Sequence, residues 1–253
     1  MVIYNNKDLG DYGVMCIGRG AYSSPARDIE QIHIPGLNGD LLYDAGGFNN
    51  VSVTYPDCYI LEDFPENIAA LRGFLLSSPG YHRLEDSYNP DEFRLAEFRG
   101  PLEAEGHTGR GNRSGHFDLI FNCMPQRFLK SGDIYVDIPL SPAEVYLKND
   151  GQPAEPFLQV RPGANAEVDI WIGSMHLTVT ESMGEAEMVY DIDTADGSVI
   201  KYKPREREYA IYNGSPDVSG TYTPIPTGTC RAYCEGLGDS DAYVKVKPRW
   251  WRL

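Results

Sequence analysis

The chain has 253 residues, a formal net charge of −15, 42% hydrophobic residues and 23% charged residues. Its apolar content excludes an intrinsically disordered protein, and its acidic surface repels phosphate backbones and so argues against tight binding of nucleic acid. No stretch of about 18 apolar residues is present, and Met1–Asp8 lacks the basic start and apolar run of a signal peptide. We therefore expect neither a membrane span nor export, and a chain that is made in the cytoplasm.

In the first half, the sequence predicts short strands, one helix and a hairpin. Asp63 is a candidate N-cap, Pro65 suits a first turn, and the apolar residues that follow recur every three or four positions. A helix is thus expected over Phe64–Ser77 and a β-hairpin over residues 81–98. The strands expected before the helix are Gly13–Ile17, Ile29–Ile34 and Val51–Tyr55.

The second half reads as strands alone. Turn residues separate the segments at the spacing typical of a β-sandwich, and Gly173-Ser174 has the composition of a tight hairpin turn. The expected strands are Phe157–Arg161, Glu167–Ile172, Met175–Thr180, Glu187–Asp191, Val199–Lys203, Glu208–Tyr212, Cys230–Cys234 and Ala242–Lys247. The overall prediction is a mainly β protein of two domains, residues 1–133 (with the helix and the hairpin) and 134–253.

Residues that could carry chemistry do not form a recognisable constellation. The five cysteines and five histidines lack zinc-ligand or nucleophile–base spacing, and Cys230 and Cys234 would share an inward strand face. Gly106–Gly115, with Arg110 and Arg113, lacks the order of a phosphate-binding loop and is expected to be a flexible loop. Asp191, Asp193 and Asp196 break the calcium-loop pattern, so we expect a turn. No catalytic, cofactor or metal residue is predicted.

Several segments resemble one protein family along the whole chain. They are the turn Ile34-Pro35-Gly36-Leu37-Asn38-Gly39 followed by a strand, the helix, the junction Phe121–Phe128, Pro156–Val160, Asp169–Gly173 and the terminus Pro248-Arg249-Trp250-Trp251-Arg252-Leu253. The chain is similar in these respects to the distal tail proteins, called Dit, of siphophages and prophages of Gram-positive bacteria. Leu140-Ser141-Pro142 departs from the Asn-Pro phrase usual in the family.

The resemblance implies a fold and a role. It implies a β-rich ring-forming domain followed by a galectin-like β-sandwich, and a homohexameric ring in the virion tail. The implied ring joins the tail tube to the tail tip or baseplate, lets DNA pass, and contacts the tail-associated lysin and receptor-binding proteins. Strand edges and a projecting hairpin such as 81–98 could be completed by a neighbouring copy.

Two other functions remain open from the sequence. A galectin-like sandwich could bind carbohydrate on the host surface, although the neighbours of Trp171 do not match a galectin sugar site. A cell-wall hydrolase with paired carboxylates is the third hypothesis. For the terminus, adjacent tryptophans in an extended segment point to opposite faces, so one is expected to anchor the tail and the other to face a second surface.

Overall fold

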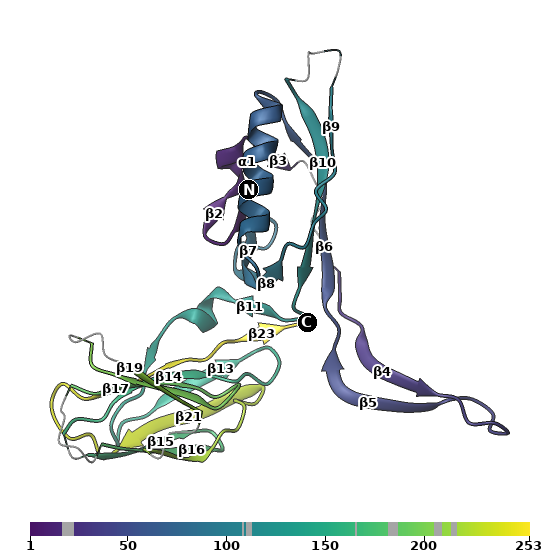
Figure 1. Cartoon of the computed structure of the whole chain (residues 1–253). Coiled ribbons are helices and arrows are strands. Elements are labelled where there is room, and N and C mark those ends of the chain that lie inside the picture. The colour runs from purple at the N-terminus through teal and green to yellow at the C-terminus, as the bar shows by residue number, and fades with distance from the viewer. Residues whose placement is uncertain are drawn as a thin grey trace. The chain divides into compact units, whose positions relative to one another are not determined.

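The structure, a computed structural model, describes residues 1–16, 23–107, 109, 113–164, 166–181, 187–204, 209–213 and 217–253. The chain forms two compact units, one of Met1–Arg127 together with Leu253 and the other of Phe128–Arg252 (Figure 1). The division thus falls between residues 127 and 128, whereas the sequence predicts it between 133 and 134. None of the described helices is long and apolar enough to cross a membrane.

The first unit is built on one antiparallel sheet. The strand order is β2-β1-β7-β8-β10-β6-β3, and β9 pairs with β10. These strands are β1 (Val2–Tyr4), β2 (Lys7–Asp8), β3 (Met15–Cys16), β6 (Val51–Ile60), β7 (His82–Asp86), β8 (Glu92–Glu97), β9 (Ala104–Gly106) and β10 (Gly115–Cys123). A separate two-stranded sheet holds β4 (Arg27–Ile32) and β5 (Leu41–Phe48).

The helix α1 spans Phe64–Ser77, as the sequence predicts, and its apolar side packs on the core. Asp63 occupies the N-cap position, but it adopts a left-handed conformation and its side chain makes no capping hydrogen bond, contrary to expectation. Instead, the Asn67 amide donates to the Glu62 carbonyl at 3.1 Å, and the Phe64 backbone N–H donates to the Arg113 carbonyl. One local and one tertiary contact therefore fix this end of the helix.

Alternating side chains of β6 and β10 form the centre of the first core. Both strands bury every second residue over most of their length, so one face of the sheet is apolar. Phe121 lies against the rings of Tyr4, Tyr55 and Phe98, with centroids 5.0–6.1 Å apart. Leu71 and Leu75 of α1 are buried in the same cluster.

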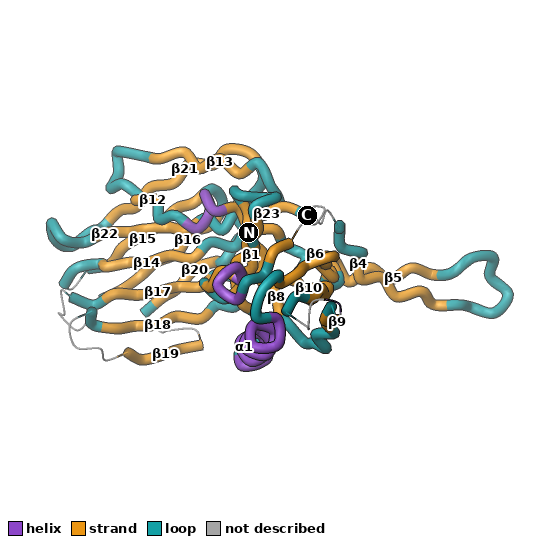
Figure 2. The backbone as a smooth tube through the Cα atoms, turned by 90° about the horizontal axis from the view of Figure 1, so that it is seen from above, coloured by secondary structure: helices purple, strands orange, loops and turns teal. Residues whose placement is uncertain are grey.

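The second unit is a β-sandwich of a six-stranded and a five-stranded antiparallel sheet (Figure 2). The first sheet has the order β12-β22-β14-β17-β18-β19 and the second β13-β21-β15-β16-β20. Their bounds are β12 (Val136–Asp137), β13 (Val145–Asn149), β14 (Phe157–Arg161), β15 (Glu167–Ile172), β16 (Met175–Thr180), β17 (Val189–Asp193), β18 (Ser198–Tyr202), β19 (Tyr209–Asn213), β20 (Val218–Thr221), β21 (Gly228–Glu235) and β22 (Tyr243–Lys247). β11 (Arg127–Leu129) pairs with the terminal β23 (Trp251–Arg252).

Inward side chains of both sheets form the second core. β14, β15, β16 and β22 alternate between buried and more exposed positions, as expected where one sheet face packs on another. β15 and β16 meet at the expected Gly173-Ser174 turn, where Gly173 has a φ of +61°. The mainly β fold class predicted from the sequence is confirmed. The sequence did not predict β12, β13 or β20.

The expected hairpin over residues 81–98 is present as β7 and β8, but it does not project. β7 also pairs with β1, and β8 also pairs with β10, so both outer edges of this hairpin are already occupied. The idea that it could be completed by a neighbouring copy is therefore wrong. The projecting hairpin is β4–β5.

Candidate functional site

The clearest candidate for an interaction site is the β4–β5 hairpin, residues 27–48, which we call the arm. It runs out from the rest of its unit as two paired strands and a tip (Figures 1 and 2). Every residue of β4 is exposed, as is all of β5 except Phe48. No described segment of the chain covers either face.

Both faces of the arm carry large apolar side chains. The cross-strand register places Ile29 and Leu42 on one face, and Ile32, Leu41 and Tyr43 on the other. With Ile34 and Leu37 at the tip, seven large apolar residues are exposed in this short segment. A concentration of this kind on a soluble protein marks a surface that another molecule covers.

Polar contacts fix the conformation of the arm near its base and tip. Arg27 forms an ion pair with Asp44 at 2.7 Å and lies 5.4 Å from the centre of the Phe48 ring. The Gly46 N–H donates to Asp44 at 2.8 Å, and this bond and Arg27 lower the pKa of that carboxyl. His33 contacts Asp40 at 3.1 Å. These contacts are exposed, and an isolated hairpin is only marginally stable, so they do not replace a covering partner.

The outer face of β6 and β10 carries an open groove in the first unit. It is lined by Asp57, Glu105, His116, Asp118, Ile120 and neighbouring residues. Two polar contacts lie within it: Asp118 accepts from the Asp57 N–H at 2.9 Å, and His116 lies 3.9 Å from Glu105. The groove is thus a mixed polar and apolar surface.

The structure describes the cysteines and acidic turn residues that the sequence analysis considers. Cys230 and Cys234 are buried in the sandwich core, as predicted. The Asp193 and Asp196 carboxylates accept the N–H groups of nearby turn residues, which is the expected turn. Within the described ranges, His, Cys, Asp and Glu side chains do not gather in threes that could hold a metal ion. Arg110, in the expected flexible loop, lies outside the described residues.

A row of stacked rings crosses the outer face of the five-stranded sheet. The Trp171 ring stacks on His176 at 4.7 Å and 12° and on Tyr233 at 5.0 Å and 11°, from the strands on either side. Arg231 lies 4.4 Å from the centre of the Tyr233 ring. Sugar rings bind proteins by stacking on a free aromatic face, and both faces of Trp171 are covered. This row does not favour the carbohydrate-binding alternative.

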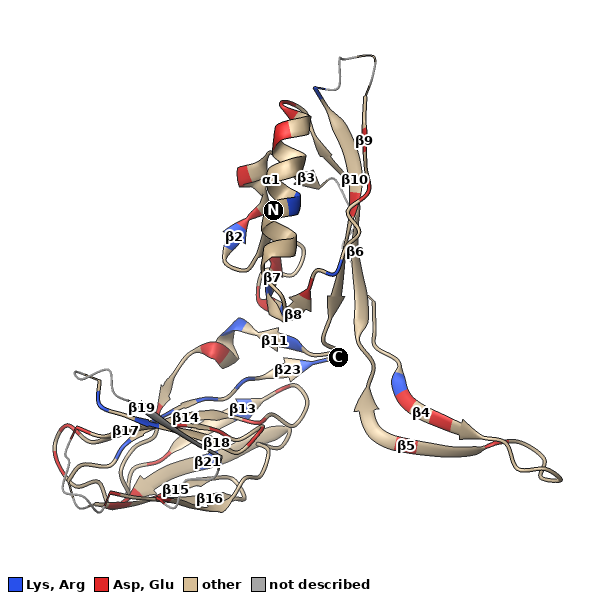
Figure 3. Ribbon diagram, viewed as in Figure 1, with Lys and Arg blue, Asp and Glu red and all other residues tan. Residues whose placement is uncertain are grey.

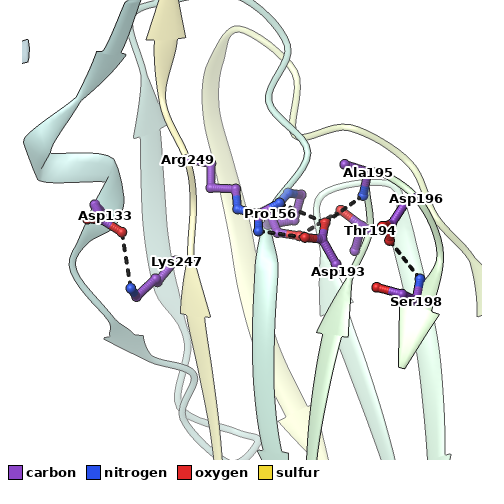
Figure 4. A network of polar contacts seen from close by, with 9 residues as sticks. All are labelled: Asp133, Pro156, Asp193, Thr194, Ala195, Asp196, Ser198, Lys247 and Arg249. Atoms are coloured by element: carbon purple, nitrogen blue, oxygen red, sulfur yellow. Dashed lines mark hydrogen bonds and ion pairs between the residues drawn. The ribbon is translucent and has the colours of Figure 1, made fainter. Parts of the chain in front are cut away.

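The terminal residues are anchored on the second unit by charge and hydrogen bonds. Arg249 donates two bonds to the Asp193 carboxylate, both at 2.7 Å, and Lys247 donates to Asp133 at 3.0 Å (Figure 4). Two parallel bonds between a guanidinium and a carboxylate fix geometry as well as add energy. In the same turn, the hydrogen bonds from Ser198 lower the pKa of Asp196.

Both terminal tryptophans pack on this same unit. Trp250 is buried in its core, and Trp251 is half-buried against that core with its indole N–H donating to the Pro153 carbonyl at 2.9 Å. The backbone leaves no room beside them, because a Cβ on Gly132 would lie 2.3 Å from the Trp250 nitrogen. Trp250 therefore anchors the terminus as expected, and whether the partly exposed Trp251 faces a second surface stays a prediction.

Comparison with known proteins shows similarity at the level of the three-dimensional fold. No family model matches the chain, and no curated protein matches it in sequence. Among solved structures, the chain is similar to the SPP1 Dit (gp 19.1) protein, described as a paradigm of the hub adsorption apparatus in phages that infect Gram-positive bacteria. The TM-score is 0.60 at 16% identity, over 97% of this chain and 96% of that one.

The chain has the fold of a phage distal tail protein. A second similar structure is the phage P2 baseplate in its activated conformation with Ca, with a TM-score of 0.53 at 10% identity over 100% of this chain and 97% of that one. The distal tail fold is matched along both units, including the sandwich. The resemblance inferred from the terminus and the order of elements is thus confirmed in the fold.

Proposed function

We propose that this chain is the structural hub of a long-tailed bacteriophage, forming a ring, as a homohexamer, that joins the tail tube to the tail tip or baseplate. The observation that carries the proposal is the likeness to the SPP1 hub protein over nearly the whole of both chains. A tail component with this fold acts through its surfaces, so the proposal assigns it no catalytic role.

The arm supplies the physical means of self-assembly. A surface patch on one copy that binds a different patch on the next makes a head-to-tail contact, and such contacts close into a ring when the rotation permits. The arm reaches beyond its own core and exposes apolar residues on both faces, so a neighbouring copy can enclose it. Enclosure removes apolar surface from water, which drives association.

The test compares two double variants of the full chain by native mass spectrometry at micromolar concentration. L42D/Y43D places one charge on each face of the arm, where the side chains are 60% and 60% exposed. L76D/Y146D is the control, with the same residue types at 57% and 61% exposure elsewhere. The wild type and the control are expected to form one closed oligomer, and the arm variant to be a monomer. A wild type that stays monomeric, or an arm variant that assembles equally well, would contradict the proposal.

The net charge of −15 fits the passage of DNA without adhesion. Acidic residues occur on both units (Figure 3), and like charge repels the phosphate backbone over about 8–10 Å at physiological salt. We include in the proposal that the lumen of the ring is acidic. A structure of the assembled ring with a strongly positive lumen would refute this part.

The proposal extends to partners and location. The ring is assigned to the virion tail, after assembly in the cytoplasm of the host bacterium, with the tail tube protein, a tail-associated lysin or tip protein, and receptor-binding proteins as partners. Its support is the hub and baseplate character of the similar structures. Purified peptidoglycan incubated with the chain is expected to stay intact, and its turnover would establish the hydrolase alternative.

A further inference from the structure

Two thiols from distant parts of the sequence meet in the first unit. Cys16 of β3 and Cys58 of β6 are direct partners in the antiparallel register. Their sulfur atoms lie 2.8 Å apart, whereas a disulfide bond is about 2.0 Å long. Residues directly opposite one another in antiparallel strands have Cα atoms about 4.5–5.5 Å apart, which lies within the range that a disulfide spans.

The two thiols differ in access and in acidity. Cys58 is fully buried, while Cys16 is partly exposed on an edge strand. The hydrogen bond between the two thiols lowers the pKa of the Cys16 thiol, and the same bond together with burial raises the pKa of Cys58. The thiolate is the reactive form of cysteine. Cys16 is therefore the thiol that meets an external oxidant first, and Cys58 is placed to react second.

The other three cysteines lack this arrangement. Cys123, Cys230 and Cys234 are buried, and burial raises the pKa of each. The Cys123 and Cys234 thiols contact backbone carbonyls, not another sulfur. These three serve as an internal reference, because we expect such buried thiols not to react with the oxidant.

We propose that Cys16 and Cys58 form a cross-strand disulfide when the protein meets a low-molecular-weight disulfide oxidant such as oxidised glutathione. The Cys16 thiolate attacks one sulfur of the oxidant, which forms a mixed disulfide and releases one glutathione thiolate. The Cys58 thiol then loses its proton and attacks the Cys16 sulfur, which expels the second glutathione. The two protein thiols are oxidised, the oxidant is reduced to two thiols, and the protein loses two hydrogens.

The proposed disulfide links the edge strand β3 covalently to β6. β3 has two residues and lies at the edge of its sheet, next to β6. The bond closes a loop from residue 16 to residue 58, and that loop contains the whole arm. Closing a long loop restricts the unfolded chain, so the oxidised protein is stabilised relative to the reduced one. The proposal stands on the thiol pair alone and holds whether or not the chain forms a ring.

The test treats the reduced, desalted full chain with oxidised glutathione and then maps peptides by mass spectrometry without reduction. The expected product is two hydrogens lighter than the starting protein, contains a linked Cys16–Cys58 peptide pair, and has a higher Tm that returns to the reduced value with dithiothreitol. C16S is expected to show neither the mass loss nor the Tm rise. C123A, which removes a reference thiol, is expected to retain both.

Circular dichroism of each variant checks that it is folded before oxidation. If C123A fails to fold, C230A takes its place as the control. A wild type that stays fully reduced, that stops at a glutathione adduct on Cys16, or that links other cysteines would overturn the proposal. Unlike the assembly test, this readout does not depend on the oligomeric state.

Discussion

Replacing Trp250 with alanine should destabilise the second unit much more than the same change at Trp251. Trp250 is 8% exposed and belongs to the sandwich core, and its carbonyl accepts the Leu129 N–H at 2.8 Å. A buried tryptophan replaced by alanine costs about 3–5 kcal/mol, because apolar contacts are lost and a cavity remains. Trp251 is half-buried with one hydrogen bond to Pro153, and we expect a cost of about 1–3 kcal/mol.

The loss of stability corresponds to a shift of the melting temperature that depends on the entropy of unfolding, which grows with the number of residues in the unit. Residues 128–252 number 125 (252 − 128 + 1). At about 2.1 cal/mol/K per residue, the entropy of unfolding is about 260 cal/mol/K, so W250A should lower the Tm by roughly 11–19 °C. We expect the unit to unfold in one cooperative step.

Tryptophan fluorescence during heating measures this transition selectively. All three tryptophans, Trp171, Trp250 and Trp251, belong to the second unit, so the signal does not report on the first. W250A keeps two of them as reporters. Calorimetry provides the control, because the transition of the first unit should not move. A W250A shift equal to or smaller than that of W251A would refute the assignment of Trp250 to the core.

Two further predictions test the packing of each unit. G115A should destabilise the first unit by about 1–3 kcal/mol, because its Cβ would lie 2.3 Å from the Phe64 ring and 2.5 Å from a backbone oxygen. G73A, in the same unit with open space around the new Cβ, should instead stabilise it by about 0.5–1 kcal/mol; calorimetry that gave both changes the same sign would contradict this reasoning. R249M should cost the second unit about 1.5–3 kcal/mol in urea unfolding followed by tryptophan fluorescence, through loss of both bonds to Asp193. A midpoint like that of the wild type would show that the pair contributes nothing.

The sequence predicts the helix and those strands whose residue pattern lies within one short segment. The helix over Phe64–Ser77 and the strands at 157–161, 167–172 and 175–180 have the predicted bounds, because periodicity and turn residues specify them. The sequence also contained the segment Leu41-Leu42-Tyr43, but such a run is typical of a buried strand. Its exposure follows from the absence of any described layer over the arm, which no local pattern encodes.

The contacts that the sequence does not predict join residues that lie far apart in the chain. Arg249 and Asp193 are 56 positions apart, and Cys16 and Cys58 are 42 apart. The two cysteines read as isolated residues because their meeting depends on the register of β3 on β6, and β6 extends to Ile60, beyond the predicted end at Tyr55. Sequence periodicity gives the face on which a side chain lies, but not the strand opposite it.

The position of β22 constrains how the second unit can fold during synthesis. β22 (Tyr243–Lys247) lies between β12 and β14, strands that the ribosome makes about a hundred residues earlier. Until residues 243–247 emerge, the facing edges of β12 and β14 have no partner, and the six-stranded sheet cannot be completed. Contacts of such high sequence separation slow folding. Residues 1–127 can fold while the second unit is still being translated. A chain that stops short of residue 243 would leave an open strand edge prone to aggregation.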